Sequence, residues 1–147
     1  MFGSLDISTS GLVAQRTRMT AIADNLANKD TLLAADGTYA PFAARSVVFS
    51  QGDAATGAPF GVTAEVGQAG TFRWADPNDP AEQIPPTVFK AAQKAGMVND
   101  EGLVKVPMVN EVAQFTDAME ALRSYEANIS VADATKRMID GALQLLA

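Results

Sequence analysis

Apolar residues recur at heptad spacing near the start of the chain and form a row of five. In chain order they are Leu5, Leu12, Met19, Ile22 and Leu26. This pattern predicts an amphipathic helix over about residues 4–28, whose apolar seam needs a partner helix. Ser8 and Gln15 stand at the other two positions of the seam, so the seam is weaker in its first half.

A longer row near the end of the chain advances by three and four residues without a break. It consists of Phe115, Ala118, Leu122, Tyr125, Ile129, Ala132, Lys136, Ile139, Leu143 and Leu146. The pattern predicts a second helix from about residue 109 onward, roughly 58 Å long at 1.5 Å per residue. The first helix is the obvious partner, but it is shorter. We therefore expect part of this row to face other chains.

The middle of the chain, residues 31–108, has the composition of turns and short strands. It contains all seven prolines and eight of the eleven glycines, which suit turns better than long helices. Strands are expected at residues 46–50, 60–66 and 103–106 and a short helix at 88–94. We predict an α+β fold of three segments, in which the helices of residues 1–30 and 109–147 pair as a coiled coil around a small β-rich middle domain, residues 31–108.

Composition narrows the possible functions. The formal net charge is −6, which argues against a nucleic-acid partner, because phosphates require a basic surface. The absence of Cys and His removes thiolate nucleophiles, Cys/His zinc sites and imidazole catalysis. No apolar run approaches a membrane span, and the N-terminus does not resemble a cleaved secretory signal.

Two acidic loops are the remaining candidates for metal binding or catalysis. A calcium loop of the EF-hand type starting at Asp76 would need Gly at position six and Glu at position twelve; the sequence has Ala81 and Thr87 there. Asp100 and Glu101 adjoin a glycine, where paired acids usually form a polar turn. We therefore expect no metal, no cofactor, no catalytic residue and no enzyme activity.

Two further features each allow two interpretations. Tyr125, with Arg123 and Glu126 beside it, is either a half-buried residue flanked by an ion pair or a contact to a neighbouring subunit. Asn28 can terminate the first helix, because Asn tolerates the left-handed conformation. The amide of Asn25 could bond either backbone of its own chain or a neighbouring chain.

Several motifs resemble one protein family. The NLAN sequence of residues 25–28, after an amphipathic helix, resembles the signature of bacterial flagellar rod and hook proteins. The run RSYEANISVADATKRMIDGALQLL, residues 123–146, is similar to the proximal-rod members of that axial family, as are SVVFSQ, residues 46–51, and GLVKVPMVNEV, residues 102–112. Residues 84–96 look like an addition to the family pattern, and Met108 and Asn110 stand where Asn and Asp are usual.

The resemblance implies a structural subunit of the proximal rod, part of the hollow drive shaft of the flagellar basal body. It implies export through the flagellar type III apparatus without a cleaved signal peptide, a periplasmic location, and assembly with copies of itself, other rod proteins and the rod–MS-ring adaptor. The terminal helices would form the inner coiled-coil layer. The alternatives are a paralogous rod or hook component and, from another class, a stand-alone periplasmic or cytosolic enzyme or binding module.

This interpretation assigns the assembly interface to the two helical rows and the NLAN junction. The expected interface residues are Leu12, Met19, Ile22, Asn25, Leu26, Asn28, Phe115, Leu122, Tyr125, Ile129, Ile139 and Leu143.

Overall fold

A computed structural model describes residues 2–52, 61–82 and 84–146. The elements in chain order are α1 (Phe2–Ala27), β1 (Arg45–Gln51), β2 (Val62–Gln68), β3 (Phe72–Ala75), α2 (Pro86–Lys94), β4 (Val104–Pro107) and α3 (Glu111–Leu146). Both long helices and three of the strands lie close to their predicted positions. Phe60, the first residue of the second predicted strand, lies outside the described residues.

Contacts divide the chain into two compact units. The helical unit comprises Met1–Ala23, Ser46–Gly67 and Val112–Ala147, and the middle unit comprises Asp24–Arg45 and Gln68–Glu111. The β1–β2 pair therefore clusters with the long helices. The division into residues 1–30, 31–108 and 109–147 describes layers of an assembly and stays a prediction.

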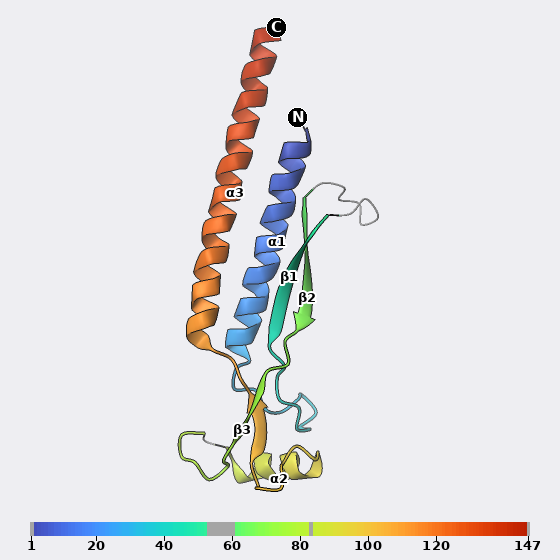
Figure 1. Cartoon of the computed structure of the whole chain (residues 1–147), viewed down its shortest axis with the longest axis vertical. Helices are drawn as coiled ribbons and strands as arrows, with labels where there is room; N and C mark the ends of the chain where they lie inside the picture. The colour runs from blue at the N-terminus through green and yellow to red at the C-terminus, as the bar shows by residue number, and fades with distance from the viewer. Residues whose placement is uncertain (1, 53–60, 83, 147) are drawn as a thin grey trace. The chain divides into compact units, whose positions relative to one another are not determined.

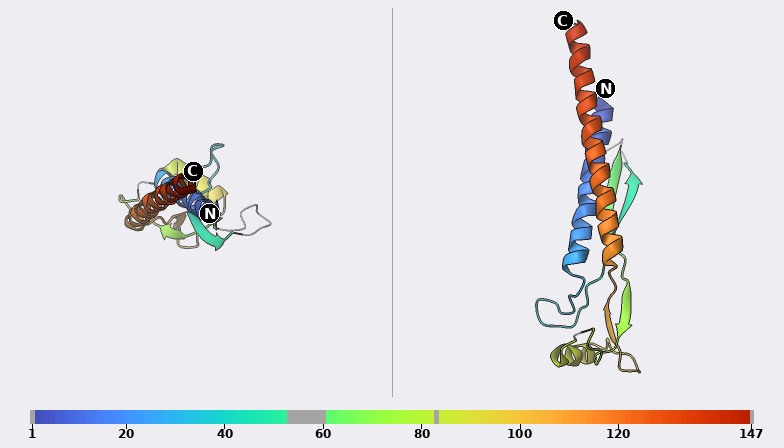
Figure 2. Two further views of the ribbon diagram at one scale, coloured as in Figure 1. Left: turned by 90° about the horizontal axis from the view of Figure 1, so that it is seen from above. Right: turned by 90° about the vertical axis from the view of Figure 1, so that its left-hand side faces the viewer.

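The helical unit is built around α1. Gly11 of α1 lies against Asn128 of α3, and Arg18 lies against Asp117, so the two helices run antiparallel. Figures 1 and 2 show α3 and α1 side by side, with β1 and β2 along another side of α1. The predicted α+β fold with two long, mutually packed terminal helices is confirmed.

The two helices differ in length. α3 has 36 residues and α1 has 26, and the last turns of α3 extend beyond the start of α1 (Figure 1). At 1.5 Å per residue the difference is about 15 Å. Near its end, α3 therefore lacks the partner that α1 provides elsewhere.

The middle unit has its own apolar core. Strands β3 and β4 pair antiparallel, with Ala75 opposite Val104 and Arg73 opposite Val106. Helix α2 covers this small sheet, and the buried residues are Tyr39, Ala75, Ile84, Val88, Ala92, Val104 and Val106. Residues 84–96, which look like an addition to the family pattern, thus supply part of the core.

Local sequence explains where α2 begins and ends. Pro86 occupies the first turn, where a missing N–H is tolerated. At the other end Gly96 has φ +68°, its N–H bonds the Gln93 carbonyl, and the Met97 N–H bonds the Ala92 carbonyl. This is the Schellman arrangement that a left-handed glycine permits. The short helix predicted over residues 88–94 is confirmed, with two further residues at its start.

Tyr39 makes the middle unit sensitive to alkaline pH. Its hydroxyl donates to the Lys105 carbonyl at 2.7 Å, and burial raises the pKa of Tyr39 to about 12. In the unfolded chain a tyrosine titrates near pH 10. Because the folded-state pKa is the higher one, the stabilisation is complete below pH 10 and is lost as the pH rises toward 12.

We expect the unfolding free energy of the middle unit, followed by Trp74 fluorescence, to be about 1 kcal/mol lower at pH 11 than at pH 9. Tyr39→Phe should lack this component of the pH dependence, because Phe has no proton to lose. An identical loss of stability in both proteins would assign the alkaline sensitivity to other groups.

Candidate assembly interface

The buried side of α3 includes only part of the predicted apolar row. Ala121 and Thr135 are buried and Tyr125, Asn128 and Ile139 are half-buried. We call these five residues the paired face. Its contacting residues are mainly small or polar. Most of the bulky apolar residues of the row lie outside it.

Four predicted interface residues of α3 are exposed. The exposed fractions are 56% for Phe115, 48% for Leu122, 40% for Ile129 and 61% for Leu143. An exposed row of large apolar side chains on a long helix marks an interaction surface more than a solvated face. Tyr125 instead lies half-buried on the paired face, and the described side chains include no ion pair between Arg123 and Glu126.

The predicted row on α1 is used mostly within the chain. Ile22 is buried, with 6% of its surface exposed, and Leu12 and Met19 are half-buried. Ser8, also in the seam, is buried and donates to the Ser4 carbonyl at 3.1 Å. Ile22 therefore has little surface left for another chain, whereas Leu12 and Met19 retain some.

Arg18 connects three elements of the helical unit, although no sequence pattern had singled it out. Its guanidinium lies 3.2 Å from the Asp117 carboxylate and 3.7 Å from that of Glu120, both on α3. The same group lies 6.0 Å from the centre of the Phe49 ring on β1. A partly buried Arg can combine ion pairing with stacking on an aromatic ring.

Gly11 shows why a glycine is retained inside α1. A Cβ at this position would lie 2.8 Å from Nδ2 of Asn128. A glycine inside a helix costs about 1 kcal/mol relative to Ala, and here its small size admits a side chain of the partner helix.

Ser10 and Gly61 join α1 to the start of β2. The Ser10 hydroxyl donates to the Ile7 carbonyl at 2.7 Å and accepts the Val62 N–H at 3.1 Å. Gly61 has φ +127°, and a Cβ there would lie 2.2 Å from Ser10 Oγ. Only glycine satisfies both the backbone angle and the close approach.

Gly61→Ala should therefore detach this end of β2 from α1. Backbone strain and the clash together should cost about 3 kcal/mol, so protection of the Val62 amide from hydrogen exchange should fall roughly 100-fold. Gly37→Ala is the matched control, because Gly37 has φ +79° but, apart from its chain neighbours, no atom of the described residues lies within 4 Å of its Cβ position, and it lies in the middle unit. Unchanged Val62 exchange in Gly61→Ala would contradict the close packing.

Asn25 bonds backbone of its own chain, which decides between the two interpretations of this residue. Its Nδ2 donates to the Arg45 carbonyl at 2.8 Å, and its Oδ1 accepts the Arg45 N–H at 2.7 Å. Asn25 is 2% exposed. One buried side-chain amide thus pairs with both backbone groups of the residue that opens β1, as a neighbouring strand would.

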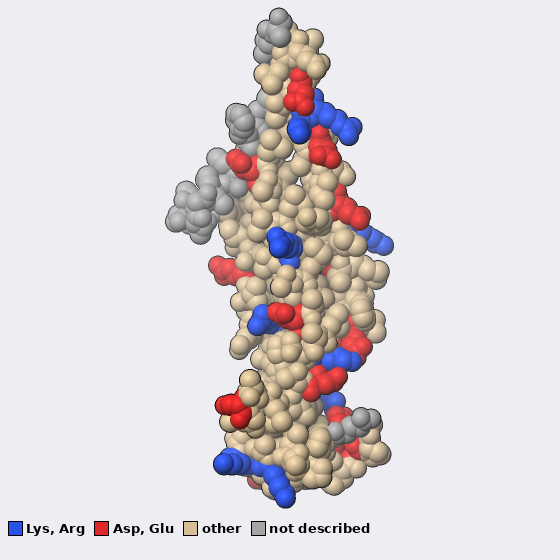
Figure 3. Space-filling view, turned by 180° about the vertical axis from the view of Figure 1, so that it is seen from behind, with Lys and Arg blue, Asp and Glu red and all other residues tan. Residues whose placement is uncertain are grey.

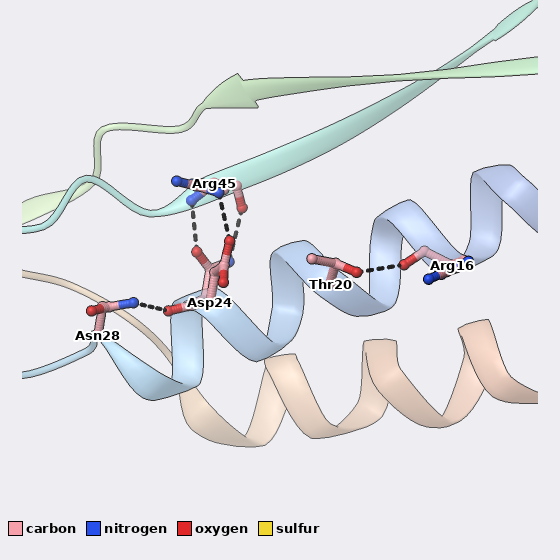
Figure 4. Close-up of polar contacts among 6 residues, drawn as sticks. Arg16, Thr20, Asp24, Asn28 and Arg45 are labelled. Carbon is pink, nitrogen blue, oxygen red and sulfur yellow. Dashed lines mark hydrogen bonds and ion pairs between the residues drawn. The ribbon is translucent and has the colours of Figure 1, made fainter.

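Charged and polar groups surround this contact in the middle unit. Figure 4 shows the Arg45 guanidinium paired with the Asp24 carboxylate, 2.5 Å apart, and Asn28 donating to the Asp24 carbonyl at 2.9 Å. Asn28 closes the last turn of α1, as predicted, and Leu26 is half-buried. Lys29 bonds Glu111, and this hydrogen bond raises the pKa of Lys29.

The distribution of charged side chains on the described surface bears on nucleic-acid and metal binding. On the face shown in Figure 3, basic and acidic side chains are interspersed among uncharged residues. Within the described ranges no three acidic side chains gather into a possible metal site, and none of the helices there is long and apolar enough to cross a membrane. Asp76 and Asp79 each accept a backbone N–H two residues ahead, as in polar turns.

Comparison with known proteins gives consistent matches. The family described as "Flagella basal body rod protein" matches residues 5–32. The chain is 33% identical to the flagellar basal-body rod protein FlgC of Bacillus subtilis, over 98% of this chain and 97% of that protein. It is 36% identical to the protein of the same name from Salmonella typhimurium and 35% identical to that from Escherichia coli, in each case over 95% of this chain and 93% of the relative.

Proposed function

Because this chain belongs to the FlgC family of flagellar basal-body rod proteins, we propose that it builds the proximal part of the rod as a structural subunit. Its place is the flagellar basal body, where it assembles with other rod components. The family is one of structural rod proteins, and we infer no catalytic role. The polymer would form a hollow shaft that transmits torque and lets exported proteins pass.

The exposed bulky residues of α3 carry this proposal. Phe115, Leu122 and Ile129 lie on a helix that is already paired with α1, yet they remain outside the contact. A helix seam that its own chain does not cover is stabilised by burial against other chains. A subunit of this kind gains its full packing only in an assembly.

The finer assignments are also part of the proposal. We infer that the helices of residues 1–30 and 109–147 form the inner layer of the rod and that residues 31–108 lie further out. The partners are further copies, other rod proteins, the rod–MS-ring adaptor and, during export, the type III apparatus. The subunit would reach the periplasm without a cleaved signal peptide.

Imaging of purified basal bodies tests the proposal directly. Density for α1 and α3 of this chain should be found in the proximal rod, and a strain lacking the gene should make no rod beyond that point. Purified basal bodies that lack this chain would contradict the proposal. A paralogous rod or hook component would instead appear at a more distal position.

A further inference from the structure

Resting on the proposed function, we infer that one flank of α3 packs on the other flank of α3 in the next copy of this chain, with the two helices parallel and offset along their axes. The first flank carries the bulky column, defined as Phe115, Leu122 and Ile129. The other carries the small column, defined as Ala127, Ala134 and Gly141. Neighbouring members of each column are separated by one heptad.

The two columns lie on opposite sides of the paired face. At about 100° per residue, the bulky column is turned roughly 100° from Ala121 in one direction and the small column roughly 140° in the other. Both are accessible: the bulky column is 40–56% exposed, Ala127 and Ala134 are exposed, and Gly141 is partly exposed. The contact with α1 therefore leaves both flanks available for a second copy.

Gly141 is an independent indication that another helix approaches here. A Cβ at Gly141 would meet nothing within 4 Å, so packing inside the described chain does not require glycine. Yet glycine inside a helix costs about 1 kcal/mol relative to Ala. Gly11 shows the usual reason for such a residue, because Asn128 of the partner helix fills the space beside it. For Gly141 that neighbour would come from another chain.

The heptad positions of the two columns correspond in one register. Both columns repeat every seven residues, so in parallel packed helices they stay in phase along the contact. In the register we infer, Phe115 lies opposite Ala127, Leu122 opposite Ala134 and Ile129 opposite Gly141. All three bulky side chains then meet small ones. Offsets one heptad shorter or longer also bring the bulky column onto the small column. Each of these two registers, however, pairs only two bulky side chains with small ones.

Charge supports the same register. Within the bulky column's length, from Phe115 to Ile129, this flank carries one charged residue, Glu126. Glu126 lies between Leu122 and Ile129. Knobs-into-holes geometry places its side chain in a hole of the next copy formed by Ala134, Arg137, Met138 and Gly141. The carboxylate of one copy would therefore lie beside the guanidinium of the other. An isolated charge in an apolar seam would be costly, and Arg137 offsets that cost.

A second copy is the occupant that fits these observations. Because the two flanks differ and are turned about 120° apart around one helix, the contact is heterologous and does not close on itself. Each copy offers its small column to one neighbour and its bulky column to the next. The axial offset between neighbouring copies is about 18 Å at 1.5 Å per residue.

Cysteine cross-linking in assembled basal bodies tests the register, since the natural chain has no cysteine. The double variant Leu122→Cys/Ala134→Cys should form a disulfide between copies on mild oxidation. Its two positions are about 18 Å apart along one helix, too far to bridge within a chain. Leu122→Cys/Ala127→Cys and Leu122→Cys/Gly141→Cys are matched controls for the registers one heptad shorter and one heptad longer, and they should give no cross-linked pair of copies.

Stronger cross-linking in either control, or none in Leu122→Cys/Ala134→Cys within flagellated cells, would overturn the inference and leave the proposed function intact. If the cysteine variants are not incorporated into basal bodies, charge-reversal variants test the register instead. Glu126→Arg and Arg137→Glu should each lose incorporation into basal bodies, and the double reversal should restore it. Absence of rescue would overturn the inference. Absence of the unaltered chain from basal bodies would instead overturn the proposed function.

Discussion

Leu122→Asp is expected to abolish motility by preventing incorporation of the subunit into the rod. Leu122 is 48% exposed on α3, so the isolated chain tolerates a carboxylate there. In the assembly the same position would be buried against a neighbour. Burying an unpaired carboxylate costs at least several kcal/mol, on the order of the whole stabilisation of a typical subunit contact.

The measurement combines swimming in soft agar with the amount of the chain in purified basal bodies. Thr116→Asp is the control, because Thr116 is an exposed polar residue of the same helix whose hydroxyl bonds the Val112 carbonyl. It introduces the same charge without placing it in the apolar row and should swim normally. Normal swimming of Leu122→Asp would remove the main support for an interface on this side of α3.

Asn25→Ala should strongly destabilise the middle unit. It removes two hydrogen bonds at once and leaves the N–H and C=O of Arg45 without their partner. Each of these hydrogen bonds contributes about 0.5–1.5 kcal/mol, and Asn25 is itself buried, so we expect a loss of roughly 3 kcal/mol. The expected result is a lower denaturant midpoint in Trp74 fluorescence.

Two further variants test whether the two hydrogen bonds to Arg45 account for the loss of stability. Asn28→Ala removes only a bond to the Asp24 carbonyl and should cost about 1 kcal/mol or less. Asn25→Asp retains an acceptor for the Arg45 N–H but directs a carboxylate oxygen at the Arg45 carbonyl, so it should resemble Asn25→Ala. Equal stability of Asn25→Ala and the unaltered chain would show that the paired contact contributes nothing.

The long helices could be predicted because their signal is local and repeats over many turns. The side of α3 that contacts α1 could not be predicted, because that side includes only part of the apolar row in the sequence. Large apolar residues dominate any such pattern, whereas the contact itself uses Ala121, Asn128 and Thr135. Sequence alone did not indicate which face α1 would take.

Contacts between segments far apart in the sequence could not be predicted either. Strand β3 is short and is defined by its pairing with β4, which lies far along the chain beyond α2. The Arg45 partner of Asn25 is likewise remote in sequence, on the far side of a long loop. In contrast, the spacing of Val88 and Ala92 within α2 is helical, so the core role of this helix could have been inferred.

The greater length of α3 over α1 has a consequence for how the polymer grows. The last turns of α3 have no α1 beside them, so a segment of about ten residues continues the helix there without tertiary packing and is expected to fray. Its ordering is therefore coupled to the arrival of a neighbour. The first contact between two copies must order the last turns of α3 in both of them. Each later copy binds to an α3 end that is already ordered. Growth should show a lag phase and a critical concentration, and it should be much faster on existing ends than in free solution.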